Sequence, residues 1–357
     1  MTRPAPKPGA YEFDAAAVGW RPFFANQCRD HESGFTPARV CRVQARRCHV
    51  WSARHPLGTH ALPIQLFGDE GLPAVGDWLL LDPRREQPPR RLERFSALTR
   101  QAPGSGFAVQ TLAANVDTLC IVTSCNQDFN TGRIERYLAL AAEAGTRPVL
   151  LLTKADLAGD PERFVAQARA LDDGLQIETL DARDPDQLAP VRELCATGQT
   201  VAALGSSGVG KSTLVNVLTG ADQAVGAVRG DDNKGKHTTT SRSLHRVPAG
   251  GVIIDLPGIR ELQLAEAAAG IDDTFAEIFA LVAECRFSNC THTQEPGCAV
   301  TAALAAGRLE PRRWDNYRKL QSEQKAYADS KAARDKRAER KNLERKKTSR
   351  RRLEEDD

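Results

Sequence analysis

The clearest chemical signature in this chain is a glycine-rich segment that matches G-x-x-x-x-G-K-[ST] at every fixed position. It consists of Gly205, Ser206, Ser207, Gly208, Val209, Gly210, Lys211 and Ser212, and Thr213 follows it. An apolar run at 201–204 precedes it and an apolar helical pattern at 211–218 follows, as a phosphate-binding loop requires. The glycines let backbone N–H groups converge on phosphate oxygens at the start of a helix. We therefore predict that residues 205–213 bind a nucleoside triphosphate, with Lys211 and Ser212 as the catalytic pair: Lys211 on the β- and γ-phosphates and Ser212 on Mg²⁺.

A second motif, Asp255-Leu256-Pro257-Gly258, ends another apolar run, 252–254. In phosphate-loop enzymes such an aspartate holds the Mg²⁺ shell, usually through water. The glycine N–H can meet the γ-phosphate, which makes the loop after it a sensor of nucleotide state. Alone, this turn is weak evidence, but here it follows a phosphate loop. Asp255 is thus a predicted magnesium ligand and Gly258 a predicted nucleotide contact.

The segment Thr153-Lys154-Ala155-Asp156 follows the apolar run 149–152 and is suited to selecting the base. A carboxylate accepts two hydrogen bonds from guanine N1–H and the 2-amino group, a pair that adenine does not offer. We predict that Asp156 distinguishes guanine from adenine and that the Lys154 stem packs over the base. The usual guanine motif begins with Asn, which Thr153 replaces. Asp181-Ala182 is the predicted source of a backbone N–H for guanine O6, although many such loops carry Ser-Ala.

The order of these motifs differs from that of ordinary GTPases, in which the phosphate loop comes first and the base motif late. Here the base motif and Asp181-Ala182 come first, and the phosphate loop, the threonine-rich segment 238–240 and D-x-x-G follow. This order predicts a circularly permuted GTPase. The chain then runs from Gly258 directly into the C-terminal region, so we hypothesise that nucleotide state reorients that region.

Three cysteines and a histidine lie within fourteen residues of one another, at Cys285, Cys290, His292 and Cys298. Three thiolates and one imidazole form a closed tetrahedral Zn²⁺ set, typical of a structural site. No position remains open for catalysis. We predict one structural zinc ion per chain.

The elements that must position these residues follow from the texture of the chain. Residues 1–35 suggest a loose, proline-rich extension, and short β-type runs between 36 and 98, including Ile64–Phe67, predict a small barrel or sandwich. Alternating strand and helix patterns from 115 to 262 predict a mostly parallel sheet covered on both faces. Helical patterns resume at 271, and Pro311–Leu353 reads as a long helix with few apolar residues, either solvated or ordered by a partner.

Composition and charge limit the classes of protein to which this chain can belong. The chain has 357 residues, of which 41% are hydrophobic, and its 49 basic and 46 acidic residues give a formal charge of +3. Fifteen basic and five acidic residues lie between Arg318 and Arg352, so the basic character belongs to the C-terminal segment. The N-terminus has no apolar signal region, and no apolar run approaches the roughly 18 residues of a membrane span. Nine irregularly spaced cysteines suit a reducing compartment, so we expect a cytoplasmic protein without a membrane partner.

Taken together, these motifs resemble those of the RsgA (YjeQ) family of ribosome-dependent GTPases over roughly residues 36–325. The resemblance implies an N-terminal all-β OB-fold barrel, a central circularly permuted α/β GTPase domain and a C-terminal α-helical zinc-binding domain. The corresponding boundaries are 1–35 for an N-terminal extension, 36–100 for the barrel, 101–265 for the GTPase domain, 266–325 for the zinc-binding domain and 326–357 for a basic tail. The resemblance also implies that the chain hydrolyses GTP in late maturation of the 30S ribosomal subunit. The subunit would stimulate this hydrolysis, and the chain would contact 16S rRNA. We expect a monomer that binds GTP or GDP.

The same resemblance assigns a switch segment to Lys234–Thr240. Thr238 or Thr239 is then the Mg²⁺-binding threonine, and the run of three threonines leaves both open. His237 is the candidate for positioning the attacking water, with a solvated loop residue as the alternative. Ile259 stands where many GTPases carry a water-orienting Gln, so slow intrinsic turnover corrected by the partner is expected. The basic tail suits phosphate contact.

Two other classes of function compete with this interpretation. One is an RNA-binding protein whose nucleotide site only switches affinity, with incidental hydrolysis; Ile259 is compatible with it. The other is a phosphate-loop NTPase unrelated to ribosomes, such as a small-molecule kinase or an ATPase. The T-K-x-D segment and the lack of an evident acceptor site count against the second.

Overall fold

The computed structural model describes residues 13–44, 47–55, 59–70, 72–102, 109–220, 242–258 and 263–355. The chain divides into two compact units, and each is treated by itself below. The first unit consists of Met1–Thr99 and Thr111–Leu262, and the second of Arg100–Gln110 and Gln263–Asp357.

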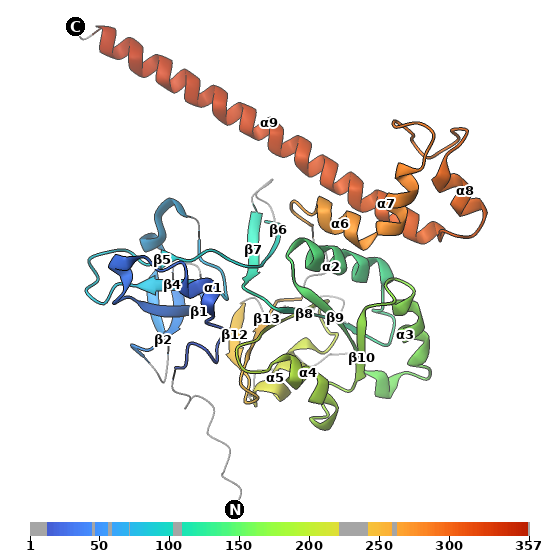
Figure 1. Cartoon of the computed structure of the whole chain (residues 1–357), viewed down its shortest axis with the longest axis horizontal. Coiled ribbons are helices and arrows are strands. Elements are labelled where there is room, and N and C mark those ends of the chain that lie inside the picture. The colour runs from blue at the N-terminus through green and yellow to red at the C-terminus, as the bar shows by residue number, and fades with distance from the viewer. Residues whose placement is uncertain are drawn as a thin grey trace, which may run out of the picture. The chain divides into compact units, whose positions relative to one another are not determined.

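Apolar runs buried on both faces form the parallel part of a mixed sheet in the first unit (Figure 1). The strand order is β10 (Gln176–Leu180), β9 (Arg147–Thr153), β8 (Thr118–Ser124), β11 (Thr200–Gly205) and β13 (Val252–Asp255). Every residue of β8, β11 and β13 is buried, which explains why these segments are nearly continuous in Val, Ile, Leu and Ala. The predicted α/β region is confirmed.

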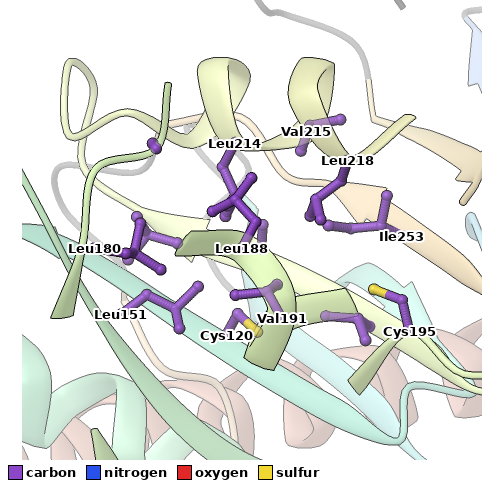
Figure 2. Close-up of a cluster of buried hydrophobic side chains, with 14 of the residues drawn as sticks. Cys120, Leu151, Leu180, Leu188, Val191, Cys195, Leu214, Val215, Leu218 and Ile253 are labelled. Atoms are coloured by element: carbon purple, nitrogen blue, oxygen red, sulfur yellow. The ribbon is translucent and has the colours of Figure 1, made fainter. Parts of the chain in front are cut away.

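Helices cover both faces of this parallel sheet. They are α2 (Thr131–Glu143), α3 (Glu162–Arg169), α4 (Ala189–Leu194) and α5 (Lys211–Thr219). Figure 2 shows Leu214 and Leu218 of α5 and Val191 of α4 packed toward Leu151 and Ile253 of the sheet. α2 lies on the opposite face (Figure 1). Full burial of each such aliphatic side chain contributes roughly 1.5–3 kcal/mol, so this cluster fixes α5, and with it the phosphate loop, on the sheet.

The N-terminal part of the same unit is β-rich. Its strands are β1 (Thr36–Gln44), β2 (Arg47–Ser52), β3 (His60–Pro63), β4 (Trp78–Leu81) and β5 (Arg90–Arg91), and β1 pairs with both β2 and β4. The strand expected at Ile64–Phe67 is wrong, because these residues form the 3₁₀ helix η2 (Ile64–Glu70). β3 ends at Pro63, which has no amide hydrogen to extend a ladder. Phe67 of η2 is buried in the small β core.

One short strand connects the two halves of the first unit. β12 (Ser243–Arg246) pairs antiparallel with β13 and also with β1, where Ser243 is opposite Arg42. The sheet therefore continues from β10 through β12 into β1, β2 and β3. The β-rich region and the α/β region are joined by backbone hydrogen bonds.

Residues 13–35 also pack against this unit, so the expected loose extension is wrong for them. They contain α1 (Pro22–Ala25) and the 3₁₀ helix η1 (Asp30–Glu32), and Phe24 is completely buried. The ring of Trp20 meets that of Trp78 edge to face at 4.9 Å. The buried guanidinium of Arg39 donates to the carbonyl of Val18 at 3.2 Å, which ties the segment to β1. Aromatic burial outweighs the prolines that suggested disorder.

The second unit is mainly helical. It contains α6 (Ala268–Thr274), α7 (Ala276–Ala283), α8 (Ala299–Ala305) and the 45-residue α9 (Pro311–Glu355). The predicted C-terminal helix is therefore present, and Trp314, Leu320 and Tyr327 in its first part are buried. In the described residues, no helix has both the length and the apolar character needed to cross a membrane.

The second unit also includes residues from earlier in the chain, at the end of β6 and the start of β7. β6 (Ala97–Gln101) pairs with β7 (Val109–Ala114), and Arg100–Gln110 group with the helices. The backbone N–H of Gln101 donates to the carbonyl oxygen of Gln263 at 3.0 Å. The side-chain amide of Gln101 donates to the carbonyl oxygen of Leu264 at 3.1 Å. The sequence contains no signal for this association.

Candidate functional site

The predicted nucleotide residues converge because parallel strands place their carboxyl ends at one edge of a sheet. Thr153 ends β9 and lies opposite Leu180, the last residue of β10. Gly205 ends β11 and Asp255 ends β13, the neighbouring strand. Base motif, phosphate loop and D-x-x-G motif therefore meet at this edge, although the sequence separates them by up to a hundred residues.

The phosphate loop joins β11 to α5. Ser206–Gly210 form the turn, and Lys211 begins the helix, with Ser212 and Thr213 in its first turn. Gly210 has φ +99°, a left-handed conformation that residues with a side chain rarely adopt. Val209 is fully buried in the hydrophobic core cluster, so its side chain holds the loop against the core. The predicted strand, turn and helix are all present here.

Lys211 is held inside the phosphate loop. Its ammonium group donates to the carbonyl oxygens of Gly205 at 2.9 Å and Ser206 at 2.6 Å. Burial lowers the pKa of Lys211 to about 8, and the nearby Asp255 partly opposes that shift. The cation thus has two weak carbonyl partners that phosphate oxygens can replace.

Asp255 has the complementary environment. Burial raises its pKa to about 6, and Lys211 opposes the shift. Its Oδ2 atom is buried and accepts no hydrogen bond from any described residue. A buried carboxylate oxygen without a partner is costly, and a hard divalent cation such as Mg²⁺ is a suitable partner for it. Asp255 fits the predicted magnesium role.

Gly258 lies directly against the phosphate loop. A Cβ atom at this position would be 2.8 Å from the Ser207 nitrogen and 2.9 Å from its Cα atom. No larger residue fits without a shift of backbone, so glycine is required here for close approach. The D-x-x-G segment is therefore adjacent to the loop that it was predicted to complement.

A pocket of about 130 Å³ opens beside the phosphate loop. Its lining comes from the base motif, the loop after β10 and the start of α5, namely Thr153, Lys154, Asp156, Leu157, Asp181, Ala182, Arg183, Gly210 and Thr213. Asp156 lies in the 3₁₀ helix η3 (Ala155–Leu157), and Lys154 has φ +58° at the turn before it. The structure thus brings the two sequence-distant segments predicted to bind guanine to one pocket.

Thr153, the departure from the usual Asn, connects this pocket to the phosphate loop. The residue is fully buried, and its hydroxyl lies 2.5 Å from the Val209 carbonyl oxygen and 3.1 Å from that of Thr123. The single hydroxyl proton is donated most directly to Val209. A threonine therefore links the base motif to the phosphate loop.

Arg183 is a pocket residue that the sequence motifs do not include. Its Nη2 atom lies 2.7 Å from Asp156 Oδ2 and 2.8 Å from Asp181 Oδ2, and its Nε atom lies 3.0 Å from Asp181 Oδ1. These bonds hold the pKa of Asp181 below its usual value. The only signal in the sequence is an arginine directly after Asp181-Ala182.

His237, Thr238, Thr239 and Ile259, together with the rest of the expected switch segment Lys234–Thr240, lie outside the described residues. Their roles remain predictions from the sequence.

The Cys/His cluster of the second unit forms one compact group. Cys285 follows α7, and Cys298 is the N-cap of α8. The ligand atoms of all four residues, which include Cys290 and His292, lie within 4.8 Å of one another. The Sγ atoms of Cys285 and Cys298 are 3.9 Å apart, and each is 3.5 Å from His292 Nδ1. Tetrahedral zinc with bonds of about 2.3 Å to sulfur and about 2.0 Å to nitrogen requires separations of roughly 3.5–3.8 Å. The cluster has the dimensions of a zinc site.

Comparisons with known proteins find relatives over most of the chain. A family model described as RsgA GTPase matches residues 91–265. The small ribosomal subunit biogenesis GTPase RsgA of Mesorhizobium japonicum is 49% identical over 312 residues, which are 86% of this chain and 89% of that protein. The protein of the same name from Opitutus terrae is 43% identical over 331 residues, covering 88% of this chain and 90% of that protein.

Solved structures show the same fold at lower sequence identity. A structure described as YloQ, a circularly permuted GTPase, is 22% identical with a TM-score of 0.56, and the match covers 84% of this chain and 98% of that chain. YjeQ from Thermotoga maritima is also 22% identical, with a TM-score of 0.55 over 80% of this chain and 97% of that one.

Proposed function

We propose that this chain, which belongs to the RsgA family of GTPases, hydrolyses GTP to GDP and phosphate in late maturation of the small ribosomal subunit. One observation carries the catalytic part of the proposal. The phosphate loop, Asp255, Gly258 and the pocket beside Asp156 lie at one edge of the parallel sheet. The relatives' names supply the ribosomal part.

In the proposed reaction the chain binds and orients the triphosphate. Lys211 would exchange the carbonyls of Gly205 and Ser206 for the β- and γ-phosphate oxygens, which are stronger partners for an ammonium group. Backbone N–H groups of residues 206–213 would surround the phosphates. Ser212 and Asp255 would hold Mg²⁺, which supplies neutralisation of the charge on the transferred phosphoryl group.

Guanine selection is assigned to the pocket beside this loop. Asp156 would accept hydrogen bonds from N1–H and the 2-amino group, the Lys154 stem would cover the base, and the Ala182 N–H would contact O6. All three residues line the same pocket, which supports this assignment. An adenine ring would present no donor pair to Asp156.

The remaining assignments complete the proposal. His237 would help to position water, and Thr238 or Thr239 would complete the magnesium shell. With Ile259 in place of a water-orienting Gln, intrinsic turnover would be slow until the 30S subunit completes the site. The β-rich region would be an OB-fold that contacts 16S rRNA, the Cys/His cluster would hold one structural Zn²⁺, and the protein would act as a cytoplasmic monomer.

Phosphate release from GTP, with and without purified small ribosomal subunits and with ATP as the matched substrate, tests the proposal. We expect slow turnover of GTP alone and strong stimulation by the subunit, with little turnover of ATP. Lys211→Ala should abolish both the basal and the subunit-stimulated GTP turnover, because Lys211 is the only basic residue of segment 205–213. Arg169→Ala removes a cation from the exposed face of α3 and is the matched control.

Each part of the proposal can fail separately. Equal turnover by Lys211→Ala and the unaltered chain contradicts the catalytic assignment. GTP turnover that does not respond to the subunit contradicts the ribosomal role alone. Turnover of ATP at the same rate as GTP contradicts guanine selection.

A further inference from the structure

The base-binding pocket contains two carboxylates where one is needed to recognise guanine. Asp156 is the predicted reader of the base, and Asp181 stands where many such loops carry a serine. Both line the pocket, and both accept a hydrogen bond from the same nitrogen, Nη2 of Arg183. A serine would add no charge here, whereas Asp181 adds a second negative charge next to the first. Like charges this close repel and disfavour a fixed orientation of either side chain.

Arg183 is placed to offset that repulsion. Its planar guanidinium donates from Nε and Nη2 to both oxygens of Asp181, the fork geometry that arginine favours. The Arg183 amide also donates to Asp181 Oδ1 at 2.9 Å, and the Asp181 amide donates to Gln187 Oε1 at 2.9 Å. The Asp181–Arg183 pair is therefore fixed within its own loop. It reaches across 27 positions in the sequence to Asp156.

The contact with Asp156 is compatible with base binding. Arg183 uses only Oδ2 of that carboxylate, and each carboxylate oxygen can accept more than one hydrogen bond. Guanine can therefore donate to Asp156 while Arg183 stays in place. An arginine that only blocked the pocket would instead have to leave both carboxylates before nucleotide enters.

We propose that Arg183 is a positioning residue for guanine recognition, which bridges Asp181 and Asp156 and orients the Asp156 carboxylate toward the base. The inference rests on the proposed GTPase function, since it concerns the same pocket. It assigns Asp181 and Arg183 a joint role: together they replace the serine of other loops. Arg183 acts through Asp156 and is not itself catalytic.

Nucleotide affinity in single and double variants tests this role. We expect Arg183→Ala to weaken GDP binding roughly two- to fivefold, because it leaves two neighbouring carboxylates without their shared cation. Arg183→Ala with Asp181→Ser should recover most of the affinity, since the second charge is then gone. Inosine diphosphate lacks the 2-amino group, so Arg183→Ala should reduce the preference for GDP over it. The loss of GDP affinity caused by Arg183→Ala should also be smaller at 1 M salt, where charges are screened.

Several controls keep the outcomes distinct. Arg183 is 65% exposed, so its removal leaves no core cavity, and thermal unfolding can verify that each variant is folded. Arg169→Ala is the matched control for loss of an exposed arginine. In turnover assays Arg183→Ala should raise KM for GTP and leave kcat nearly unchanged.

Two results would overturn the inference while leaving the proposed function intact. One is GDP affinity in Arg183→Ala equal to that of the unaltered chain. The other is weakened binding that Asp181→Ser does not recover, because that shows a role other than offsetting charge. If the unaltered chain itself fails to prefer GDP over ADP, the proposed guanine specificity fails first, and with it the basis for this role.

Discussion

At the scale of single residues, the site depends on short contacts between segments that carry separate motifs. Thr153 is the clearest example. An asparagine is usual at its position, and the sequence alone gives no role to the threonine hydroxyl. The structure instead places the Thr153 hydroxyl 2.5 Å from the Val209 carbonyl of the phosphate loop. One hydroxyl thereby couples the position of the base motif to that of the phosphate loop.

Removing this hydroxyl tests the coupling. Valine has the shape of threonine but no donor, so Thr153→Val leaves the buried Val209 carbonyl without this partner. A lost buried hydrogen bond costs about 1 kcal/mol or somewhat more, and we expect roughly five- to tenfold weaker GDP binding by titration calorimetry. Thr153→Ser keeps the hydroxyl and should bind GDP nearly as tightly as the unaltered chain. Equal affinity in the Val and Ser variants would show that the contact does not matter for binding.

At the scale of elements, β12 has more influence than its four residues suggest. It pairs with β13 on one side and β1 on the other, so it joins the α/β region to the β-rich region. Its His245 is partly buried, and the ring nitrogen Nε2 lies 2.7 Å from the Ser243 hydroxyl. Burial, and to a lesser extent the charge of Arg42, lowers the pKa of His245 to about 4. The folded strand therefore favours a neutral ring.

This shift predicts a stability that depends on pH. Between the ordinary pKa of 6.5 and about 4, the unfolded chain binds the His245 proton and the folded chain does not. Stability is therefore full above pH 6.5 and is lost progressively as pH falls toward 4. We expect His245 to cost about 1–2 kcal/mol of unfolding free energy at pH 5 relative to pH 7.5, measured by urea denaturation. His245→Gln should show a smaller loss between these pH values, and an equal loss would contradict the assignment.

At the scale of the whole molecule, charge is distributed unevenly. The first part of α9 contributes buried aromatic and aliphatic residues to the second unit, including Trp314, Leu320 and Tyr327. The later part is dominated by Lys and Arg, and residues 331–352 contain twelve basic and three acidic side chains. The single helix thus combines a segment that packs with a segment whose composition suits a polyanion.

The basic segment should make the proposed binding to the small ribosomal subunit steeply dependent on salt. Replacing residues 345, 346, 347, 350, 351 and 352 by Gln removes six positive charges while keeping good helix formers. We expect weaker binding between 50 and 200 mM salt and a slope of log affinity against log salt reduced by up to about 5. Gln at the exposed Arg163 and Arg169 of α3 is the control and should leave the slope nearly unchanged. An unaltered slope in the six-residue variant would mean that this segment makes no phosphate contacts.

Much of the site could be predicted from sequence because its chemistry is carried by contiguous residues. A phosphate loop needs glycines, lysine and serine in one turn, and zinc needs four ligands that a short loop can bring together. The segments 205–213, 255–258 and 285–298 carry those requirements locally, so residue type and spacing indicated both sites. Strand and helix patterns around them were equally local, which is why the parallel sheet was predictable.

The tertiary structure alone decided how distant segments meet. The Thr153–Val209 and Arg183–Asp156 contacts span 56 and 27 positions, and no local pattern encodes them. The pairing of β12 with β1, the packing of residues 13–35 and the association of Gln101 with Gln263 are likewise long-range. Such contacts depend on which surfaces become adjacent when the core forms. Their energies come from burial and complementary geometry, which a one-dimensional pattern of residue types does not contain.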